Sequence, residues 1–280
     1  MNVLGIYREE IFSPGKIQED KQIMDKALAG ISRFGIDTKA LSPESIPEMC
    51  EAGLVLNMAQ SEKSLSILKR WEENGTRVIN SPGSIINCYR KNMVSLLKEN
   101  GFPIPKSWIY DLEAIVEELF QIYSLGWLGT YWIKRGDFHA IEARDVVKVS
   151  SFKDMEEALI YFKEKRVPQI VIQEHRQGKI IKFYGVGDKY IKAFLLPDIK
   201  EFKLDPMVKD MILKAIRCLD LEVYGGDMII EPSGNILLLD INDWPSFSLC
   251  QDEAAKEIAG YIKSIMEDSY ELSSRSKKSG

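Results

Sequence analysis

Two carboxylates and an amide near the end of the chain have the spacing of a metal site. Asp227 and Asp240 lie in two apolar runs that the sequence Pro-Ser-Gly-Asn separates, which is a strong signal for a β-hairpin. A turn centred on Ser233 and Gly234 places Asp227 opposite Asp240, where two like charges repel each other. Asn242 follows on the same face as Asp240. Oxygen ligands of this kind suit Mg²⁺, so we expect a Mg²⁺ site here, with a pair of solvated carboxylates as the alternative.

The composition is that of an ordinary globular protein. Of the 280 residues, 45% are hydrophobic and 28% are charged, and the net charge is −5. No basic run precedes the C-terminal tail, so nucleic acid is not an expected partner. No apolar run approaches the roughly 18 residues of a membrane span, and the N-terminus lacks a signal-peptide pattern. We therefore expect a cytoplasmic protein that does not bind membranes.

Cysteine and histidine usage disfavours several enzyme classes. The four cysteines are widely spaced without a C-x-x-C pair, which predicts buried thiols rather than a disulfide framework or a zinc site. The chain has only two histidines, His139 and His175. A multi-histidine metal site or a Ser-His-Asp triad is hard to build from them.

The first 85 residues alternate short apolar runs with helical patterns. We expect strands near 3–7, 54–58 and 77–80, and helices near 17–34 and 61–73. This order predicts a parallel α/β lobe, whose ligands bind at the carboxyl ends of the strands. That rim holds Arg8, Met58 and Asn80, so we expect the second substrate there. Arg8 as a plain surface cation is the alternative.

From residue 86 onward the pattern changes to an α+β region. A helix, a link marked by Pro103 and Pro105, and a second helix over 112–123 are expected first. The predicted strands then follow one another with tight turns, at 130–135, 145–150, 168–175, 179–187, 189–197 and in the hairpin 223–242. This order indicates largely antiparallel sheets, with helices at 152–166 and 205–220 laid on them and a closing helix from about 251 to 266.

Five short segments, in one collinear order, resemble the ATP-grasp superfamily. They are Arg90-Lys91-Asn92-Met93 with the sequence 101–105, then 132–136, 171–175 and 181–187, and the hairpin that carries Asp227, Asp240 and Asn242. The resemblance implies an N-terminal α/β pre-ATP-grasp lobe over 1–85, an ATP-grasp domain of two subdomains over 86–270, and a disordered tail over 271–280. It also implies ATP as a substrate and Mg²⁺ as its ion, with Mn²⁺ as the alternative.

The same resemblance implies roles for individual residues. Asp227, Asp240 and Asn242 would bind the metal ion. The nucleotide would contact Lys91, Lys134, Gln173, Glu174, His175 and Lys182, with adenine read by the backbone at Glu174 and His175. Lys134, Lys182 and His139 would act in catalysis, although His139 could also be a polar loop residue. Lys134 is the strongest of these candidates on its residues alone, because it lies in a strand among aromatic residues.

Two further expectations concern the neighbours of these residues. A turn over 176–179 would join the strands on either side of it into a hairpin and place Gln173 opposite Lys182. The sequence Trp244-Pro245-Ser246-Phe247, directly after the metal ligands, would form a wall of the acceptor site. A packed turn is the alternative for these four residues.

The resemblance implies an ATP-dependent ligase of the carboxylate–amine or carboxylate–thiol kind, similar to the ribosomal-protein glutamate ligase branch. Its reaction would pass through an acyl phosphate, and its substrate would be a small molecule or a peptide. Residues 173–187 also resemble inositol polyphosphate kinases, so a polyol phosphate kinase is one alternative. A nucleotide-binding module without turnover is another. The identity of both substrates and the oligomeric state stay open.

Overall fold

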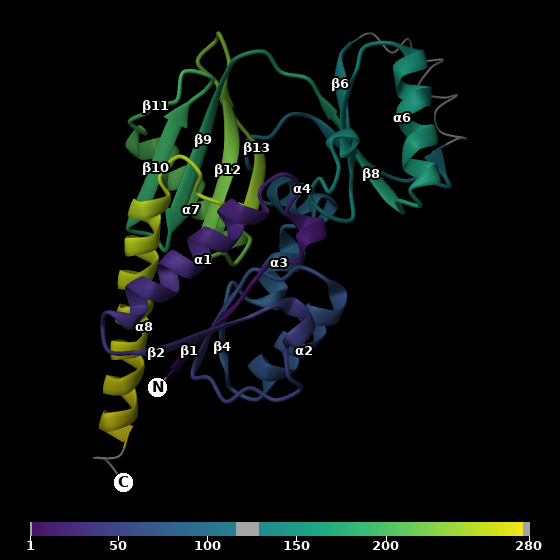
Figure 1. The fold of residues 1–280 in the computed structure, drawn as a ribbon. Coiled ribbons are helices and arrows are strands. Elements are labelled where there is room, and N and C mark those ends of the chain that lie inside the picture. Colours follow the sequence, from purple (N-terminus) through teal and green to yellow (C-terminus); the bar gives the residue numbers. More distant parts are fainter. Residues whose placement is uncertain (1, 116–128, 277–280) are drawn as a thin grey trace.

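The computed structural model describes residues 2–115 and 129–276, which form three sheets with flanking helices (Figure 1). The N-terminal sheet is parallel, in the order β2-β1-β3-β4. Its strands are β1 (Asn2–Ile6), β2 (Asp37–Leu41), β3 (Leu54–Asn57) and β4 (Arg77–Ile79). Helix α1 (Ile17–Ser32) packs on one face and α2 (Glu62–Glu73) on the other. Successive side chains of β1 pack in different hydrophobic cores. Val3 packs in the core that α1 covers, and Leu4 packs in the core that α2 covers.

The second sheet is antiparallel, in the order β5-β8-β6-β7. Its strands are β5 (Ser107–Asp111), β6 (Tyr131–Arg135), β7 (Val146–Val149) and β8 (Gln169–Glu174). Helix α6 (Phe152–Glu164) begins at a Ser151–Asp154 capping box and covers one face through Met155, Leu159 and Phe162. This small lobe stands apart on one side of the molecule in Figure 1.

The third sheet has five antiparallel strands, in the order β11-β10-β9-β12-β13. They are β9 (Lys179–Val186), β10 (Tyr190–Leu195), β11 (Lys200–Glu201), β12 (Val223–Ile230) and β13 (Ile236–Asp243). Helices α4 (Arg90–Glu99) and α7 (Pro206–Cys218) pack on one face. Helices α8 (Gln251–Ser276) and α1 serve the other, so that α1 joins the first lobe to this sheet. The short helix α3 (Pro82–Asn87) and single 3-10 turns at 10–12, 43–45 and 143–145 complete the elements.

The fold class predicted from the sequence is confirmed, because a parallel α/β lobe precedes largely antiparallel sheets. Three strands were not predicted: β2, β5 and the two-residue β11. The strands β2 and β5 lie at sheet edges and are largely half-buried or exposed, which removes the apolar run that marks a strand. Most of the helix expected over 112–123 lies outside the described residues.

The predicted hairpin that would place Gln173 opposite Lys182 is wrong. Strand β8 pairs with β5 and β6, whereas β9 pairs with β10 and β12 in the other sheet. Both strands are therefore already paired on both edges. The segment between them crosses from one sheet to the other instead of turning back.

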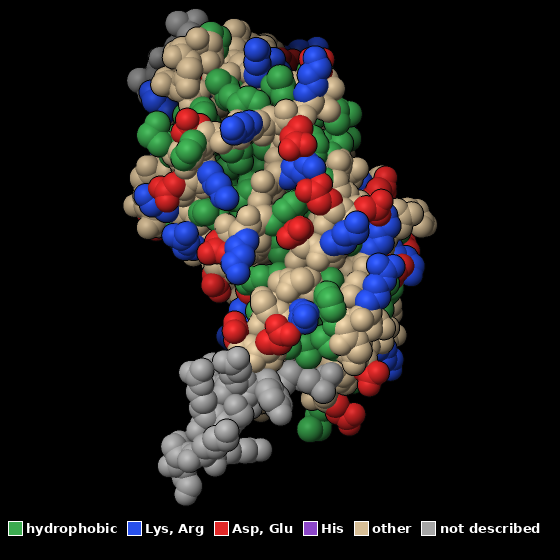
Figure 2. Space-filling model, turned by 90° about the vertical axis from the view of Figure 1, so that its left-hand side faces the viewer, with side chains coloured by type: hydrophobic (Ala, Val, Ile, Leu, Met, Phe, Trp, Pro, Cys, Tyr) green, Lys and Arg blue, Asp and Glu red, His purple; other side chains and the backbone are tan. Residues whose placement is uncertain are grey.

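Helix α8 continues to Ser276, past its expected end near 266 and into the expected tail. The boundaries proposed at residues 85 and 270 remain predictions. None of the described helices is long and apolar enough to cross a membrane. On the face shown in Figure 2, acidic and basic side chains are interspersed, and neither sign forms a continuous patch.

Candidate functional site

The centre of the site is a row of three charged residues on adjacent strands. Lys182 of β9 lies opposite Asp227 of β12, which lies opposite Asp240 of β13. The Lys182 Nζ donates to both carboxylate oxygens of Asp227, at 3.1 and 3.2 Å. The predicted pairing of Asp227 with Asp240 is therefore present. Lys182 relieves the expected repulsion between the two carboxylates.

Two further cations reach this row from other elements. Arg90, the first residue of α4, is 3% exposed, and its guanidinium lies 3.4 Å from Asp240 Oδ2. It also donates to the carbonyl oxygen of Arg135, at 3.2 Å. Lys134 of β6 is 9% exposed and donates to Gln173 Oε1 at 2.7 Å. The small lobe, through Lys134, and the five-stranded sheet, through Asp227 and Asp240, thus contribute to one charged site.

Burial and neighbouring charge set the ionisation of these groups. Burial, together with the positive charge of Arg90, lowers the pKa of Lys134 to about 8. Burial opposes ionisation of Asp240, but Arg90, His139 and Lys134 outweigh it and hold the pKa of this carboxyl below its usual range. The site therefore holds a carboxylate that stays charged and an ammonium that loses its proton near pH 8.

Several buried polar atoms of the site make no hydrogen bond within the described residues. Among the described residues, six buried side-chain nitrogen and oxygen atoms make no hydrogen bond. Four of them belong to this site: Arg90 Nε, Asp240 Oδ1 and both ring nitrogens of His139. Buried polar groups without partners are costly and uncommon. Their concentration here indicates a site that a polar ligand completes.

The predicted metal ligands lie on one side of the hairpin. Asn242 follows Asp240 on β13 and is half-buried. The Asp240 Oδ1 is buried without a partner, so at least one carboxylate oxygen is available to a cation. No three His, Cys, Asp or Glu side chains of the described residues form a metal-binding group. The two carboxylates and the amide fit Mg²⁺, provided that phosphates or water supply its remaining oxygen ligands.

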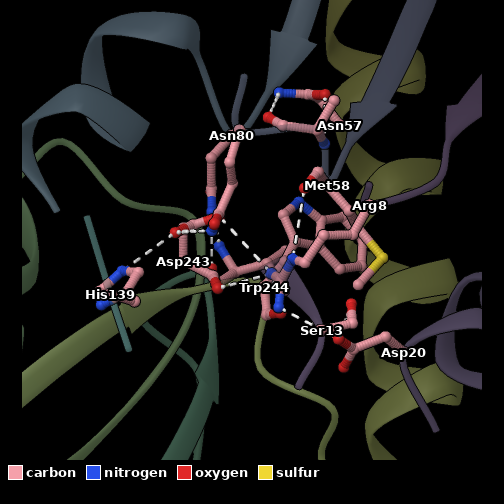
Figure 3. A network of polar contacts seen from close by, with 12 residues as sticks. Arg8, Ser13, Asp20, Asn57, Met58, Asn80, His139, Asp243 and Trp244 are labelled. Atoms are coloured by element: carbon pink, nitrogen blue, oxygen red, sulfur yellow. Dashed lines mark hydrogen bonds and ion pairs between the residues drawn. The ribbon is translucent and has the colours of Figure 1, made fainter. Parts of the chain in front are cut away.

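A polar network joins the site to the N-terminal lobe, as Figure 3 shows. The side chain of Asp243, at the end of β13, is buried and accepts from Gln60 Nε2 at 2.9 and 3.2 Å. His139 points at this carboxylate, with its Nε2 3.6 Å away. Burial opposes ionisation of Asp243, but His139, Arg8 and Gln60 lower its pKa. His139 thus lies beside a carboxylate that also contacts the N-terminal lobe through Gln60.

Phe138 fixes the segment that carries His139. Its ring packs 5.2 Å from Phe12 of the N-terminal lobe and 4.8 Å from Tyr89, which precedes α4. Lys91 contributes its backbone N–H, which donates to the carbonyl oxygen of Gly136 at 3.0 Å. The segment after β6 is therefore closed onto the N-terminal lobe.

The backbone N–H groups of the expected adenine hinge make hydrogen bonds within the protein. The N–H of Glu174 donates to Lys106 and that of His175 donates to Thr130, at 2.8 and 2.9 Å. These two N–H groups are therefore engaged within the protein, and an adenine contact through the backbone at Glu174 and His175 stays a prediction. His175 Nδ1 accepts from the indole of Trp132 at 3.0 Å, and Gln173 positions Lys134.

The wall expected at 244–247 is a packed turn. Trp244 and Phe247 are fully buried, and the Trp244 indole donates to the carbonyl oxygen of Ile79 at 3.1 Å. Both residues have positive φ, 34° and 51°, which indicates backbone held in place by its surroundings. Two core side chains cannot line an acceptor site.

Arg8 is neither a surface cation nor a free substrate ligand. Its guanidinium donates to Asp20, to the carbonyl oxygens of Met58 and Trp244, and to that of Asp243, at 2.7–3.3 Å. Figure 3 shows it inserted among these groups. With its donors engaged, Arg8 fastens the N-terminal lobe to the end of β13.

Sequence reasoning missed Arg90 and chose its neighbour Lys91. Lys91 is half-buried and makes no side-chain hydrogen bond or ion pair with the part of the chain described here. A signal for Arg90 does exist. Arg90 lies at helical spacing from Met93, Val94 and Leu97, the buried stripe of α4, whereas Lys91 has such a spacing to Val94 alone.

Neither a scan of protein-family models nor a search of curated proteins gives a match. Solved structures do match. The ATP-grasp ligase PsnB, in complex with a precursor peptide and AMPPNP, is 19% identical with a TM-score of 0.64, over 93% of this chain and 97% of that one. The VanG D-Ala:D-Ser ligase from Enterococcus faecalis is 12% identical with a TM-score of 0.72, over 93% and 99%. The D-cycloserine synthetase DcsG is 14% identical with a TM-score of 0.70, over 93% and 98%. At these identities the likeness shows a shared fold, and it spans nearly the whole chain.

Proposed function

We propose that this chain, which has the ATP-grasp fold, is an ATP-dependent ligase that joins a carboxylate to an amine or a thiol. The observation that carries the proposal is the convergence of Arg90, Lys134 and Lys182 on Asp227 and Asp240, in a site whose buried polar atoms lack partners. Such a site suits a polyanion that arrives with a divalent cation. The fold neighbours add support, because a PsnB complex contains Mg and ADP.

In this proposal Arg90 and Lys134 hold the phosphates of ATP. Both side chains are buried and charged, and both are anchored to rigid elements, α4 and β6. Preorganised cations of this kind stabilise the charge of a transferring phosphoryl group. Gln173 keeps the Lys134 ammonium in place, and Lys182 contacts the carboxylate of Asp227. The ring of His139 makes no hydrogen bond with the described residues, and while its Nε2 lies 3.6 Å from Asp243, its Nδ1 would contact a phosphate or an acceptor group.

Asp227, Asp240 and Asn242 would hold Mg²⁺, and Mn²⁺ would substitute for it. The ion would neutralise phosphate charge when bound. The protein's own task is to orient the nucleotide and to bind the substrate carboxylate beside it. The segment at Phe138, whose ring packs on Phe12 and Tyr89, would help to keep water from this region.

The chemistry needs little side-chain acid–base work. An oxygen of the substrate carboxylate attacks the γ-phosphorus, the bond to ADP breaks, and an acyl phosphate forms. The amine or thiol then attacks the acyl carbon, and inorganic phosphate leaves. Positioning and charge neutralisation account for the lowered barrier. We propose a cytoplasmic enzyme whose substrate is a small molecule or a peptide, as the precursor peptide in the PsnB complex suggests.

An isotope experiment tests this reaction. The protein is incubated with ATP, Mg²⁺, and a panel of carboxylates labelled with ¹⁸O, each offered with amines and thiols. A ligase releases phosphate that carries one ¹⁸O atom and forms an amide or a thioester, detected by mass spectrometry. A kinase instead forms ADP and a phosphorylated alcohol without free phosphate. Phosphate without ¹⁸O, or no ADP with any pair, would rule out the proposed ligase reaction for the compounds tested.

A further inference from the structure

The Lys182–Asp227 ion pair occupies one half of the proposed metal site. The Lys182 ammonium contacts both oxygens of Asp227, so no oxygen of this carboxylate is free of the lysine. Asp240 differs, because Arg90 contacts only its Oδ2 and its Oδ1 is buried without a partner. An entering cation therefore meets one open carboxylate oxygen and one carboxylate that is already neutralised.

The β-ladder holds this lysine in place. Lys182 and Asp227 are direct partners on β9 and β12, so their side chains start from adjacent backbone positions. Their side chains are only 24% and 29% exposed, which strengthens the attraction between the two charges. A divalent ion can take Asp227 as a ligand only if the ammonium withdraws from at least one oxygen.

We propose that Lys182 is a displaceable counter-cation, which blocks Asp227 from binding a divalent ion until nucleotide phosphates give the lysine a new partner. This inference rests on the proposed function. Its consequence is synergy between two ligands: the ion binds weakly to the free protein and more tightly to the nucleotide complex. By reciprocity, the nucleotide binds more tightly when the ion is present.

Direct measurement of Mn²⁺ binding tests this role without relying on turnover. Electron paramagnetic resonance of unbound Mn²⁺ gives its affinity for the protein without nucleotide, and with saturating AMPPNP once the Mn²⁺ bound by AMPPNP alone, measured without protein, is subtracted. Without nucleotide, Lys182→Met is expected to bind Mn²⁺ about tenfold more tightly than the parent, because a charge-assisted contact no longer competes for Asp227. The ratio between the two affinities should fall by at least the same factor.

Two variants serve as controls. Lys182→Arg keeps the charge and should bind Mn²⁺ as weakly as the parent when nucleotide is absent. Lys189→Met removes the same charge from an exposed position in the turn before β10, and it should leave both affinities unchanged. If Lys182→Met does not fold, Lys182→Gln replaces it in the same titrations.

The outcomes separate this inference from the proposed function. Equal Mn²⁺ affinities of Lys182→Met and the parent without nucleotide would overturn the role of Lys182 and leave the metal site intact. Equal affinities of the parent with and without AMPPNP would also overturn it. A parent protein that binds no Mn²⁺ under either condition would instead contradict the metal-dependent function itself.

Discussion

At the scale of single residues, each aspartate of the site has a cationic side chain as its ion-pair partner. Lys182 neutralises Asp227 and Arg90 neutralises Asp240, while Gln173 holds Lys134 through a neutral oxygen. The sequence predicted the pairing of Asp227 with Asp240, which the strand register confirms, and it selected Lys134 and Lys182 as candidates, whose roles stay predictions. It did not identify Arg90, because a charged residue at a helix start is usually solvated, and only its spacing from the apolar stripe of α4 distinguishes it from Lys91.

Separate replacement of Arg90 and of Lys91 by alanine distinguishes the roles of the two side chains. Arg90→Ala should weaken ATP binding by about tenfold or more, because a charge-assisted phosphate contact contributes about 1.5–3 kcal/mol. Lys91→Ala should change the affinity by less than about threefold, as is usual for a cation without a fixed partner. Calorimetric titration of both variants with ATP and Mg²⁺ gives the comparison. Equal losses would assign Lys91 to the phosphates as well.

The lowered pKa of Lys134 predicts a pH dependence of nucleotide binding. ATP prefers the charged ammonium, so its affinity should be constant below about pH 8 and should fall as pH rises through that value. Without nucleotide the folded state should instead gain stability between about pH 8 and 10.5, because the unfolded chain then binds the extra proton. Lys134→Arg should remove the break near pH 8. An unchanged break in this variant would assign the titration to another group.

At the scale of elements, the hairpin β12–β13 pairs Asp227 with Asp240 as predicted, but only because of a β-bulge that the sequence does not indicate. The turn is a three-residue loop between Glu231 and Asn235, centred on Ser233 alone, which shifts the strand register by one residue from the predicted one. The residue pairs near the turn are therefore shifted by one residue from the predicted register, so that Met228 faces Leu238 instead of Leu239. A β-bulge that leaves Leu239 unpaired then restores Asp227 to Asp240. Without the bulge, Asp240 would lie on the other face of the sheet.

Gly226, next to Asp227, is required for the close approach of these strands. A Cβ there would collide with the carbonyl oxygen of Asp240 and with the ring of Phe183. Gly226→Ala should therefore lower the free energy of unfolding by about 1–3 kcal/mol. Gly260→Ala is the matched control: it lies in α8 with open space around it, and it should add up to about 1 kcal/mol. Chemical denaturation checks both signs, and a neutral Gly226→Ala would show that the strands can separate locally.

At the scale of the whole molecule, the contacts that place the site join residues far apart in sequence. Arg8 and Trp244 are separated by 236 positions, and Gln60 and Asp243 by 183. Periodicity and turn signals report local structure, so they predicted the parallel lobe and most strands but not these contacts. The same limit explains the wrong hairpin at Gln173, since the partner strand β5 carries too weak a pattern to be predicted.

Arg8 should contribute to the stability of the whole molecule. Arg8→Ala leaves Asp20 buried without its ion-pair partner and removes the contacts to β13, so it should cost about 3–5 kcal/mol of unfolding free energy. Arg33→Ala removes the same charge from an exposed position after α1 and should stay within about 0.5 kcal/mol of the parent. Thermal unfolding followed by circular dichroism compares the two. Similar melting of both variants would show that the lobes are held together by the apolar core alone.

The most direct test of the account is a calorimetric titration of the protein with AMPPNP in the presence of Mg²⁺. The parent should bind one nucleotide per chain, and chelation of Mg²⁺ should weaken that binding. Lys134→Met should lose about tenfold or more in affinity, whereas Lys148→Met, an exposed lysine on the neighbouring strand β7, should bind as the parent does. A parent protein that binds no nucleotide, or a Lys134→Met variant with parental affinity, would contradict the proposed site.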